Sequence, residues 1–489
     1  MKIFFLALFT LLHLPLHAAP LSWQSCEEDP FYLWQDDEPH MQCALLSVPL
    51  AYHHDNRSPR KNNSRTVTLA LSRIPAEGKR LGSLILVSGG PGQSGIQPAL
   101  YDNPHTHALR KHFDLVFYDP RGVGLSTPRI QCHDYGDPIA DSAREFVADC
   151  QTHSEPGLLA HIGSDEAAND LDRIRRALGD EKISLVAYSY GTKVATLYAL
   201  RFPEHVRAIV LDGIVDLFES DYSIRLHQEK SYQRTFERYL AHCTRAPHCP
   251  FAAGHSGANA LLPLIVWREN LAARPPHWTE TLYNHVALLL DLDEKIRYIP
   301  EERTILSAVQ NALLWPDYWP FLSDSLLLFA QGEGDYLNYL GTNFEEFGDD
   351  ALVAINCADM ARPMPDSENL ILQRHIDLQS PYDNHHLKTR NDLLDPCGLW
   401  PYPGGDYRNP LPAAPPANLP PLLLIAQRHD PATPWHNAER MSQYLQSPLV
   451  TRESDGHTLA LTGISTCIDE IASAYLLDPQ QPRMDTICE

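Results

Sequence analysis

A short apolar segment that ends in a serine constrains this chain more than any other feature. The segment ISLVAYSYG, residues 183–191, begins with strand-forming residues and reaches Ser189 between the small residues Ala187 and Gly191. A stretch of helical character, residues 192–201, follows it. A strand, a sharp turn that carries a serine and then a helix form the local structure called a nucleophile elbow, in which small residues keep strand and helix apart. So short a pattern also arises by chance, so its surroundings decide its meaning.

The N-terminal residues have the layout of a secretory signal peptide. Lys2 supplies a positive charge, residues 3–16 are almost wholly apolar, and small residues follow them. The apolar run is short for a membrane-spanning helix. We therefore expect cleavage after Ala18, and an uncleaved membrane anchor is the alternative. No later stretch is apolar and long enough to span a bilayer, so we expect no membrane span after cleavage.

The ten cysteines agree with export. An even number of cysteines behind a signal peptide indicates disulfides formed in an oxidising compartment. Connectivity does not follow from sequence. Pairing neighbours is the simplest arrangement, because each pair then closes a short loop without crossing another: Cys26–Cys43, Cys132–Cys150, Cys243–Cys249, Cys357–Cys397 and Cys467–Cys488. A metal site is the alternative reading, and the lack of any CxxC pair argues against zinc.

The net charge restricts the partners of the chain. Nucleic acid binding requires a basic surface that neutralises phosphates, and the formal net charge here is −23, so we expect no nucleic acid partner. An acidic surface can attract cationic ligands, although solubility alone also accounts for such a charge. The length of 489 residues allows about three average domains or one large core with an insertion.

Short apolar segments alternate with helical patterns in the first part of the chain. The segments at residues 83–87, 113–118 and 206–211 have strand character. Between them, residues 164–179 carry apolar side chains at helical spacing and end in a glycine. This alternation predicts an α/β fold with a mostly parallel sheet flanked by helices on both faces.

A glycine-rich loop, Ser88-Gly-Gly-Pro-Gly92, follows the first of these strands. Glycines let backbone N–H groups approach a ligand closely. In hydrolases with a nucleophile elbow, such a loop supplies one oxyanion donor, and the residue after the nucleophile supplies the other. A phosphate-binding loop is the alternative, but the Gly-Lys-Ser/Thr sequence that it requires is absent.

The alternation stops at about residue 216. Long helical patterns, such as residues 223–242 and 301–314, take its place. The proline-rich segment 410–421 then has the composition of a stiff linker, and a strand pattern returns after it. We therefore expect a signal peptide at residues 1–18 and a first part of the core at residues 19–215. An inserted and largely helical cap should follow at residues 216–409, and a C-terminal part of the core at residues 410–489.

Two later residues complete a catalytic set with Ser189. Asp430 follows a strand-like segment that starts at residue 421, and His457 follows another near residue 450. The order Ser, Asp, His, each just past a strand, is that of the α/β-hydrolase fold. A serine hydroxyl needs a neutral imidazole to take its proton and a carboxylate to orient that imidazole. Any one of the 24 histidines alone would more simply be structural, so the joint order predicts the triad.

Three motifs, the loop at residues 88–92, the run DPRGVGLS at 119–126 and the elbow at 187–191, together resemble the proline iminopeptidase and tripeptidyl aminopeptidase family of serine peptidases. The runs DPATP and DGH near the C-terminus, with Cys467 and Cys488, look like the C-terminal region of secreted bacterial tripeptidyl aminopeptidases. The resemblance covers about residues 44–213 and 421–488, and the cap has no matching motif.

The resemblance implies an α/β-hydrolase core with a helical cap that removes residues from peptide amino termini without metal or cofactor. It implies Ser189 as the nucleophile, Asp430 as the orienting acid and His457 as the base. It also implies the backbone N–H groups of Gly90 and Tyr190 as the two oxyanion donors. Two departures stand out. The family loop usually begins with histidine where this chain has Ser88, and Ala187 replaces the first glycine of the elbow.

We therefore expect an exported bacterial serine aminopeptidase, periplasmic or secreted, that cleaves peptides with a free amino terminus through an acyl-enzyme on Ser189. A carboxylesterase or lipase with the same triad is the alternative. A hydrolase fold that has lost activity and serves for binding is a third, and an intact triad argues against it.

An aminopeptidase must also bind a protonated amine near the scissile bond. Burying that cation unpaired is costly, so carboxylates should line the end of the pocket. Asp430 is committed to His457, so the cap should provide them. The acidic residues that we consider are Glu345, Glu346, Asp349, Asp350, Glu219 and Asp221. A solvated acidic loop is the simpler interpretation of each, but we expect at least one cap carboxylate to bind the amine.

Overall fold

A computed structural model describes most of the chain. The residues described are 21–28, 31, 40–52, 65–97, 103–133, 142–245, 249–251, 302–342, 349–360, 362–380, 395–402, 411–481 and 483–489. The expected signal peptide and its cleavage site lie outside this set. Within the set, no helix is both long and apolar enough to cross a membrane.

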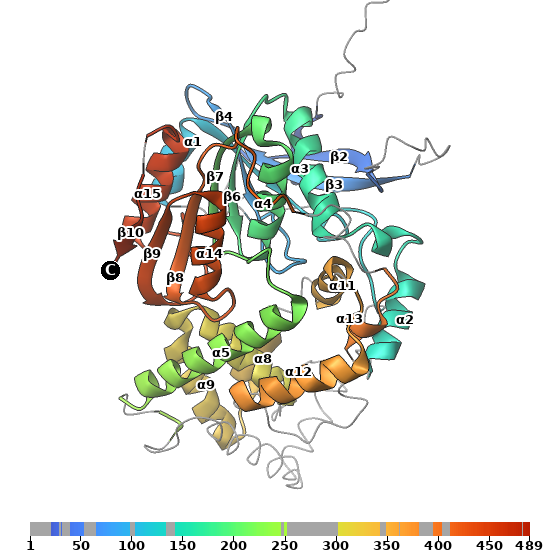
Figure 1. Ribbon diagram of the computed structural model, residues 1–489, viewed down its shortest axis with the longest axis vertical. Coiled ribbons are helices and arrows are strands. Elements are labelled where there is room, and N and C mark those ends of the chain that lie inside the picture. Colours follow the sequence, from blue (N-terminus) through green and yellow to red (C-terminus); the bar gives the residue numbers. More distant parts are fainter. Residues whose placement is uncertain are drawn as a thin grey trace, which may run out of the picture.

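One mixed sheet of ten strands runs through the described part of the molecule (Figure 1). Its order is β1-β2-β3-β5-β4-β6-β7-β8-β9-β10. The first strands, through the β3–β5 pair, run antiparallel, and every pair from β4–β5 to β9–β10 is parallel. The bounds are β1 Gln24–Ser25, β2 Gln42–Pro49, β3 Thr66–Ile74, β4 Gly82–Val87, β5 Phe113–Tyr118, β6 Ile183–Tyr188, β7 Val206–Asp212, β8 Leu423–His429, β9 Leu449–Asp455 and β10 Thr486–Cys488.

The central strands are buried at every position, because helices cover both faces of the sheet. β4, β5 and β6 have six residues each, and all are buried. Alternate residues of β4 join two different hydrophobic clusters, Ile85 on one face and Leu84 on the other. The first face packs on α3 (Ser164–Leu178), α4 (Tyr190–Arg201) and α14 (Trp435–Leu445), and the second on α1 (Pro104–Arg110) and α15 (Thr466–Leu477). The predicted sheet with helices on both faces is thus confirmed.

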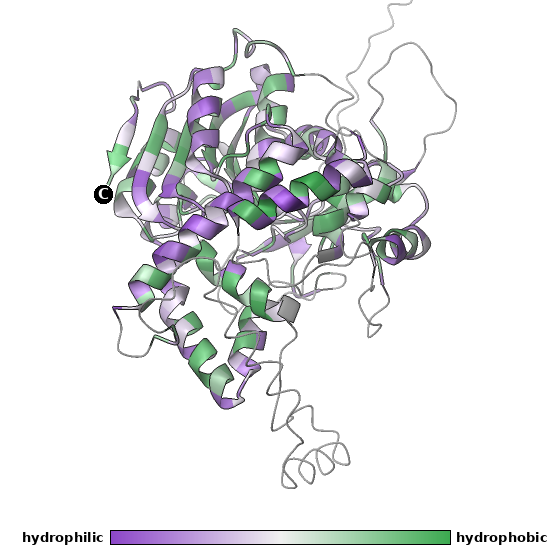
Figure 2. Cartoon of the chain, turned by 60° about the horizontal axis from the view of Figure 1, so that its bottom comes forward, coloured by the Kyte–Doolittle hydropathy of each residue, from purple (hydrophilic) through white to green (hydrophobic). Residues whose placement is uncertain are grey.

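Helices between β7 and β8 form a third hydrophobic cluster, away from the sheet. α5 (Asp221–Cys243), α8 (Glu302–Leu314), α9 (Trp319–Gln331) and α10 (Asp335–Thr342) pack around side chains such as Phe236. They lie below the sheet in Figure 1, with α12 (Asp366–Gln379) beside α5. Figure 2 shows hydrophilic and hydrophobic residues along the same helices, as one-sided packing requires. This is the helical cap that the sequence predicted.

The first cap helix begins two residues earlier than its predicted start at residue 223. The side chain of Ser220 accepts a hydrogen bond from the backbone N–H of Ser223 and so caps the helix at Asp221. The cap therefore starts almost directly after the short loop that leaves β7.

Helix α11 (Asp349–Asp359) belongs to the core, although the expected cap range includes it. Its Ile355 lies in the hydrophobic cluster of the sheet, not in that of the cap. Asp350 Oδ2 accepts a hydrogen bond from the backbone of Cys132 (2.7 Å), and Cys357 is bonded to Cys397 in α13 (Pro396–Leu399). We propose that the cap comprises the other helices between residues 216 and 409, and that α11 is a part of this range that packs on the core.

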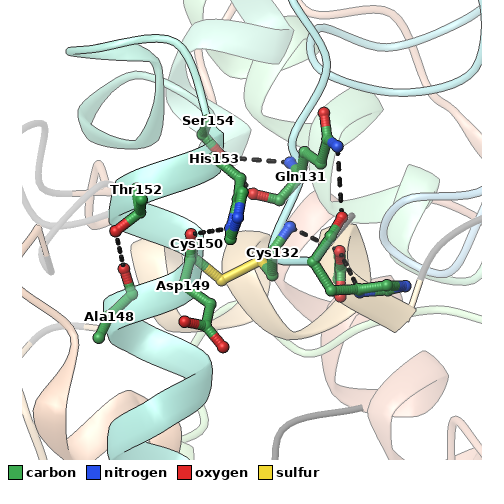
Figure 3. The surroundings of a disulfide bond; sticks show 10 residues. Gln131, Cys132, Ala148, Asp149, Cys150, Thr152, His153 and Ser154 are labelled. Atoms are coloured by element: carbon green, nitrogen blue, oxygen red, sulfur yellow. Dashed lines mark hydrogen bonds and ion pairs between the residues drawn. A yellow bond between two sulfur atoms is a disulfide. The ribbon is translucent and has the colours of Figure 1, made fainter. Parts of the chain in front are cut away.

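The ten cysteines form five disulfides, and these join the neighbours that the simplest pairing predicted. Figure 3 shows Cys132–Cys150, which ties the chain after β5 to α2 (Ala143–His153). Close by, Ser154 Oγ donates to the carbonyl of Gln131 (2.9 Å) and accepts from its N–H (3.1 Å). Disulfides persist in oxidising compartments, so this pairing fits an exported protein.

A buried ion pair fixes the DPRGVGLS run against the core. The guanidinium of Arg121 donates to both carboxylate oxygens of Asp170 on α3, at 2.7 and 2.6 Å, and each side chain is 1% exposed. It also donates to the carbonyls of Leu50 and His161, both at 2.8 Å. A buried guanidinium is tolerated only when it is paired and hydrogen-bonded in this way.

Removing one partner of this pair should be strongly destabilising. Asp170→Asn leaves the buried charge of Arg121 uncompensated, and we expect it to lower the free energy of unfolding by about 3–5 kcal/mol in urea titrations. Glu155→Gln is the control, because it breaks an ion pair on the surface. The side chain of Arg65 in that pair is 48% exposed and that of Glu155 is 55% exposed. The control should cost less than about 1 kcal/mol. Equal losses in the two variants would contradict this account.

Candidate active site

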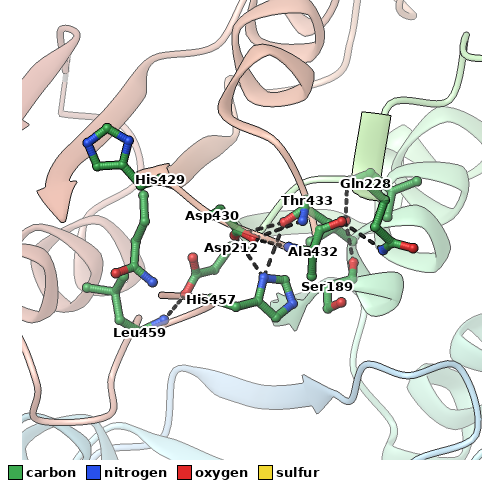
Figure 4. A network of polar contacts seen from close by, with 12 residues as sticks. Ser189, Asp212, Gln228, His429, Asp430, Ala432, Thr433, His457 and Leu459 are labelled. Atoms are coloured by element: carbon green, nitrogen blue, oxygen red, sulfur yellow. Dashed lines mark hydrogen bonds and ion pairs between the residues drawn. The ribbon is translucent and has the colours of Figure 1, made fainter. Parts of the chain in front are cut away.

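Three residues expected to act together follow parallel strands of the sheet. Ser189 follows β6, Asp430 follows β8, and His457 lies two residues past β9. β6, β7, β8 and β9 are successive parallel neighbours, so their carboxyl ends lie along one edge. In the view of Figure 4, the imidazole of His457 lies between Asp430 and Ser189. The sheet thus brings together side chains from distant parts of the sequence, since Ser189 and His457 are 268 residues apart.

The turn at Ser189 has the backbone of a nucleophile elbow. Its φ of 52° and ψ of −125° are rare for a residue with a side chain and persist only where the surroundings enforce them. The N–H of Ser189 donates to the carbonyl of Asp212 (2.9 Å), and its own carbonyl accepts from Thr192 Oγ1 (2.6 Å). A Cβ at Gly191 would lie 2.5 Å from the carbonyl oxygen of Val87, so only glycine lets the helix pass β4 so closely.

The glycine-rich loop lies directly against this turn. A Cβ at Gly89 would come within 3.0 Å of the Cβ of Ser189. Ser88, where the related family has histidine, donates from Oγ to the carbonyl of Gln93 (2.9 Å) and so closes the loop on itself. The loop is therefore supported without a histidine. The oxyanion donors stay a proposal, with the backbone N–H groups of Gly90 and Tyr190 as the expected pair.

Asp430 is fixed on every side. Its Oδ1 accepts from the backbone N–H groups of Ala432 and Thr433, both at 2.8 Å. Its Oδ2 accepts from Thr433 Oγ1 (2.9 Å) and lies 2.8 Å from Nδ1 of His457. A carboxylate on Nδ1 holds the tautomer that leaves Nε2 as the proton acceptor. Sequence reasoning missed Thr433, although it stands in the DPATP run.

The histidine loop also contacts the cap. The backbone N–H of His457 donates to the carbonyl of Leu314 at the end of α8 (2.8 Å). Next to it, a Cβ at Gly456 would lie 3.0 Å from the ring of Pro316. The position of the imidazole therefore depends on a cap helix as well as on the sheet.

Asp212 is a third carboxylate near the Asp430–His457 pair, and sequence reasoning missed it. It ends β7, and its Oδ2 accepts from the backbone N–H groups of Leu459 (2.6 Å) and Ala460 (2.7 Å). Its Oδ1 is buried without a hydrogen-bond partner among the described residues. Burial raises the pKa of Asp212 to about 6. Its place directly after the strand predicted at residues 206–211 was the available signal.

The charges around His457 favour its protonated form. Burial lowers the pKa of the imidazole, but the charge of Asp430, the hydrogen bond to Asp430 and the charge of Asp212 outweigh it. The pKa of His457 therefore lies above the ordinary histidine value. In an enzyme that uses this imidazole as a base, the active neutral form would appear only as pH rises through that raised pKa.

The acidic residues considered for the substrate amine have different surroundings. Glu345 and Glu346 lie outside the described residues, as does the side chain of Asp349. Asp350 is engaged by the backbone of Cys132 and by Nδ1 of His133 (3.1 Å), so it anchors α11. Glu219 is engaged by two histidines, and Asp221 is the first residue of α5.

A different buried carboxylate, Asp359, lies beside the nucleophile turn. It accepts from Tyr190 Oη (2.7 Å), Lys193 Nζ (3.1 Å) and the backbone of Ser164 (2.8 Å). A cavity close by is lined in part by Ser88, Gly89, Tyr190 and Ile355. With these donors and the hydroxyl of Ser164 (3.2 Å) on it, Asp359 supports the turn.

Glu229 on α5 is a cap carboxylate that sequence reasoning did not single out. Its neighbour Gln228 donates to the carbonyl of Ala432 (2.9 Å), in the loop that carries Asp430 (Figure 4). Burial raises the pKa of Tyr232, and the negative charges of Glu229 and Asp430 both add to this effect. The charges of Glu229 and Asp430 thus act on the same tyrosine. The charge-rich sequence of α5 gave no signal for it.

Comparison with known proteins identifies the class. Residues 82–259 match the sequence profile of the family described as alpha/beta hydrolase fold, and residues 386–488 match that described as TAP-like protein. The serine protease Hip1 of Mycobacterium tuberculosis is 32% identical, with 91% of this chain and 87% of that protein covered. The chain therefore belongs to the α/β-hydrolase superfamily and is a serine hydrolase.

Two further relatives carry the names of two different kinds of hydrolase, an esterase and an aminopeptidase. Carboxylesterase B of Mycobacterium tuberculosis is 32% identical, with 97% of this chain and 91% of that protein covered. Tripeptidyl aminopeptidase of Streptomyces lividans is 26% identical, with 96% and 87% covered. Relatives with peptidase and esterase names thus match the chain over nearly its whole length.

The role of Asp212 can be tested by the pH dependence of hydrolysis. In the unmodified protein, kcat/KM should fall as pH drops through the raised pKa of His457, because a protonated imidazole cannot take a proton. Asp212→Asn removes a negative charge that favours the protonated imidazole, so this limb should move to lower pH. Glu155→Gln, an exposed carboxylate on the surface, should leave the profile unchanged. A limb that stays in place or rises in Asp212→Asn would refute the electrostatic role.

Proposed function

We propose that this protein is an exported serine aminopeptidase that removes short peptides from free amino termini through an acyl-enzyme on Ser189. The observation that carries the proposal is the arrangement of Ser189, His457 and Asp430 at strand ends of one sheet, with Asp430 bonded to His457 Nδ1 at 2.8 Å. The relatives named tripeptidyl aminopeptidase and serine protease support a peptide substrate.

The residues have the following roles in the proposed reaction. Ser189 Oγ attacks the carbonyl carbon of the scissile amide while His457 Nε2 accepts its proton, and the proton then passes to the leaving amine. A water molecule, deprotonated by the same imidazole, hydrolyses the ester and regenerates Ser189. Asp430 stabilises the imidazolium in both halves. The N–H groups of Gly90 and Tyr190 bind the oxyanion of each tetrahedral intermediate.

Export is part of the proposal. The signal-like residues 1–18 support it, as do the five disulfides, because thiols are kept reduced in the cytosol. We propose the periplasm or the surrounding medium as the location.

Recognition of the amine by a cap carboxylate completes the proposed specificity. Asp350 and Glu219 are engaged by other side chains, and Glu229 also has a partner, since Ser380 Oγ lies 3.5 Å from its Oε2. Glu229 is the described cap carboxylate that we favour, because its neighbour Gln228 donates to the carbonyl of Ala432 in the loop that carries Asp430. Glu345, Glu346 and Asp349 remain further choices from the sequence.

Carboxylesterase activity is the alternative, and the relative named carboxylesterase B supports it. An esterase requires the same triad and differs only in the pocket. It has no need of a carboxylate for a substrate amine, so the amine requirement separates the two functions.

The triad predicts large losses of turnover. Ser189→Ala and His457→Ala should each lower kcat by a factor on the order of 10⁴ or more, Asp430→Ala by less, and the losses should not add, because the three act as a unit. Circular dichroism should be unchanged. Ser442→Ala, which removes a hydroxyl bonded within the α14 region, is the control and should retain activity. Near-normal turnover by Ser189→Ala would rule out the proposed nucleophile.

The amine requirement predicts a clear substrate preference. A peptide anilide with a free amine should be cleaved much faster than its N-acetylated twin, and both should be compared with a simple aryl ester. Glu229→Gln should lower kcat/KM for the free-amine peptide about 10- to 100-fold, the range for a hydrogen bond to a charged group, and leave ester hydrolysis within about twofold.

Glu237→Gln is the matched control, because Glu237 is an exposed carboxylate on the same helix. It should affect neither substrate. Equal cleavage of the free and acetylated peptides would mean that no amine site exists and would favour the esterase or endopeptidase reading.

A further inference from the structure

Two histidines and a glutamate converge where the cap leaves the core. Glu219 lies just before α5, His227 is on α5, and His436 is on α14 of the core. Nδ1 of His227 lies 2.7 Å from Oε1 of Glu219, and Nε2 of His436 lies 3.6 Å from the same oxygen. One ligand atom from each residue lies within 4.8 Å of the other two. Three side chains from separate segments thus point to one place.

The carboxylate of this cluster is buried and the imidazoles are accessible. The side chain of Glu219 is 7% exposed, while those of His227 and His436 are 42% and 45% exposed. The two rings stand edge to face, with centroids 5.1 Å apart. The negative charge of the cluster is therefore buried at its bottom. The exposed imidazoles leave an open side through which an ion and a water molecule can enter.

Neighbouring contacts hold the two halves of the cluster in place. Asp216 Oδ2, three residues before Glu219, accepts from Arg440 of α14 (2.9 Å), and Phe218 packs on the ring of Tyr444 of α14 (4.6 Å between centroids). At the start of α14, Trp435 Nε1 donates to Thr451 of β9 (2.9 Å). The backbones that carry Glu219 and His436 are thus positioned independently of the contact between their side chains.

We propose that Glu219, His227 and His436 bind a divalent transition metal ion of the zinc class. Two imidazole nitrogens and one carboxylate oxygen are a donor set that suits Zn²⁺, whereas Ca²⁺ and Mg²⁺ prefer oxygen ligands alone. Tetrahedral zinc with ligands at about 2.0–2.2 Å requires donor atoms roughly 3.3–3.6 Å apart. Small side-chain rotations bring the three atoms to that spacing, and water takes the open position.

This site is separate from the catalytic residues and has a structural role. It joins α5, the first helix of the cap, to α14 of the core. His227 adjoins Gln228, which donates to the Ala432 carbonyl, and the N–H of Ala432 donates to Asp430. The metal thus fastens the cap helix that borders the loop of the catalytic acid, while hydrolysis itself proceeds on Ser189 without it. The lack of CxxC pairs bears on cysteine ligands only, and this site has no cysteine.

The test uses the full-length secreted protein with its disulfides intact. After treatment with EDTA and removal of the chelator, ZnCl₂ is titrated in by calorimetry, and the melting temperature is measured with and without the ion. We expect one zinc site with a Kd of about 10 µM or below. At a zinc concentration 100-fold above Kd, the melting temperature should rise by about 2–3 °C for a chain of this size.

Variants separate this site from the other histidines of the chain. His227→Gln and His436→Gln alter half-exposed side chains, so both should fold, and each should lose one zinc site and the associated rise in melting temperature. His153→Gln, on α2 of the core, is the matched control and should bind as the unmodified protein does. CaCl₂ and MgCl₂ should produce no rise. Ester hydrolysis by His436→Gln should stay within about twofold of normal.

Two results would overturn the proposal. One is that the unmodified protein shows no zinc site tighter than about 10 µM. The other is that His227→Gln and His436→Gln retain the site and the thermal shift of the unmodified protein. In either case Glu219 serves only as an ion-pair partner for the two histidines. Since the readouts are binding and melting temperature, neither result depends on which substrate the enzyme hydrolyses.

Discussion

The backbone of Ser189 holds a conformation that its own side chain disfavours, and the central part of the molecule is arranged to enforce it. The N–H and carbonyl of the residue are both hydrogen-bonded, β6 is paired on both sides, and Gly191 lets α4 lie against the end of β4. A strained turn of this kind costs on the order of 1–3 kcal/mol and persists because the surrounding sheet is rigid. The buried core therefore holds the backbone of Ser189 in a conformation that residues with a side chain rarely adopt.

Much of this arrangement could be predicted from the sequence, because it rests on local patterns. Apolar runs followed by glycine-rich or acidic turns marked the strand ends, and parallel strands place those ends on one edge. Ser189, Asp430 and His457 could therefore be grouped without knowing any distance between them. Neighbour pairing of the cysteines also needed no three-dimensional information, because each pair closes a loop short enough to form locally.

The environments of the acidic residues could not be predicted in the same way, because contacts between distant segments determine them. Asp350 and Glu219 looked like free cap carboxylates, yet one anchors α11 to the chain near Cys132 and the other is engaged by His227 and His436. The core position of α11 has the same origin, since its helical pattern does not reveal which cluster it packs on. Asp212 was hidden for a different reason: the last residue of a buried strand reads as a simple turn residue.

The hydrogen bond between the His457 N–H and the Leu314 carbonyl makes the proposed base a shared part of the core and the cap. A displacement of α8 that opened the catalytic edge would break this bond and release the loop that aims the imidazole. The position of the imidazole and the position of α8 thus depend on each other through this hydrogen bond. The loop that carries His457 would therefore be held in place only while α8 lies against it.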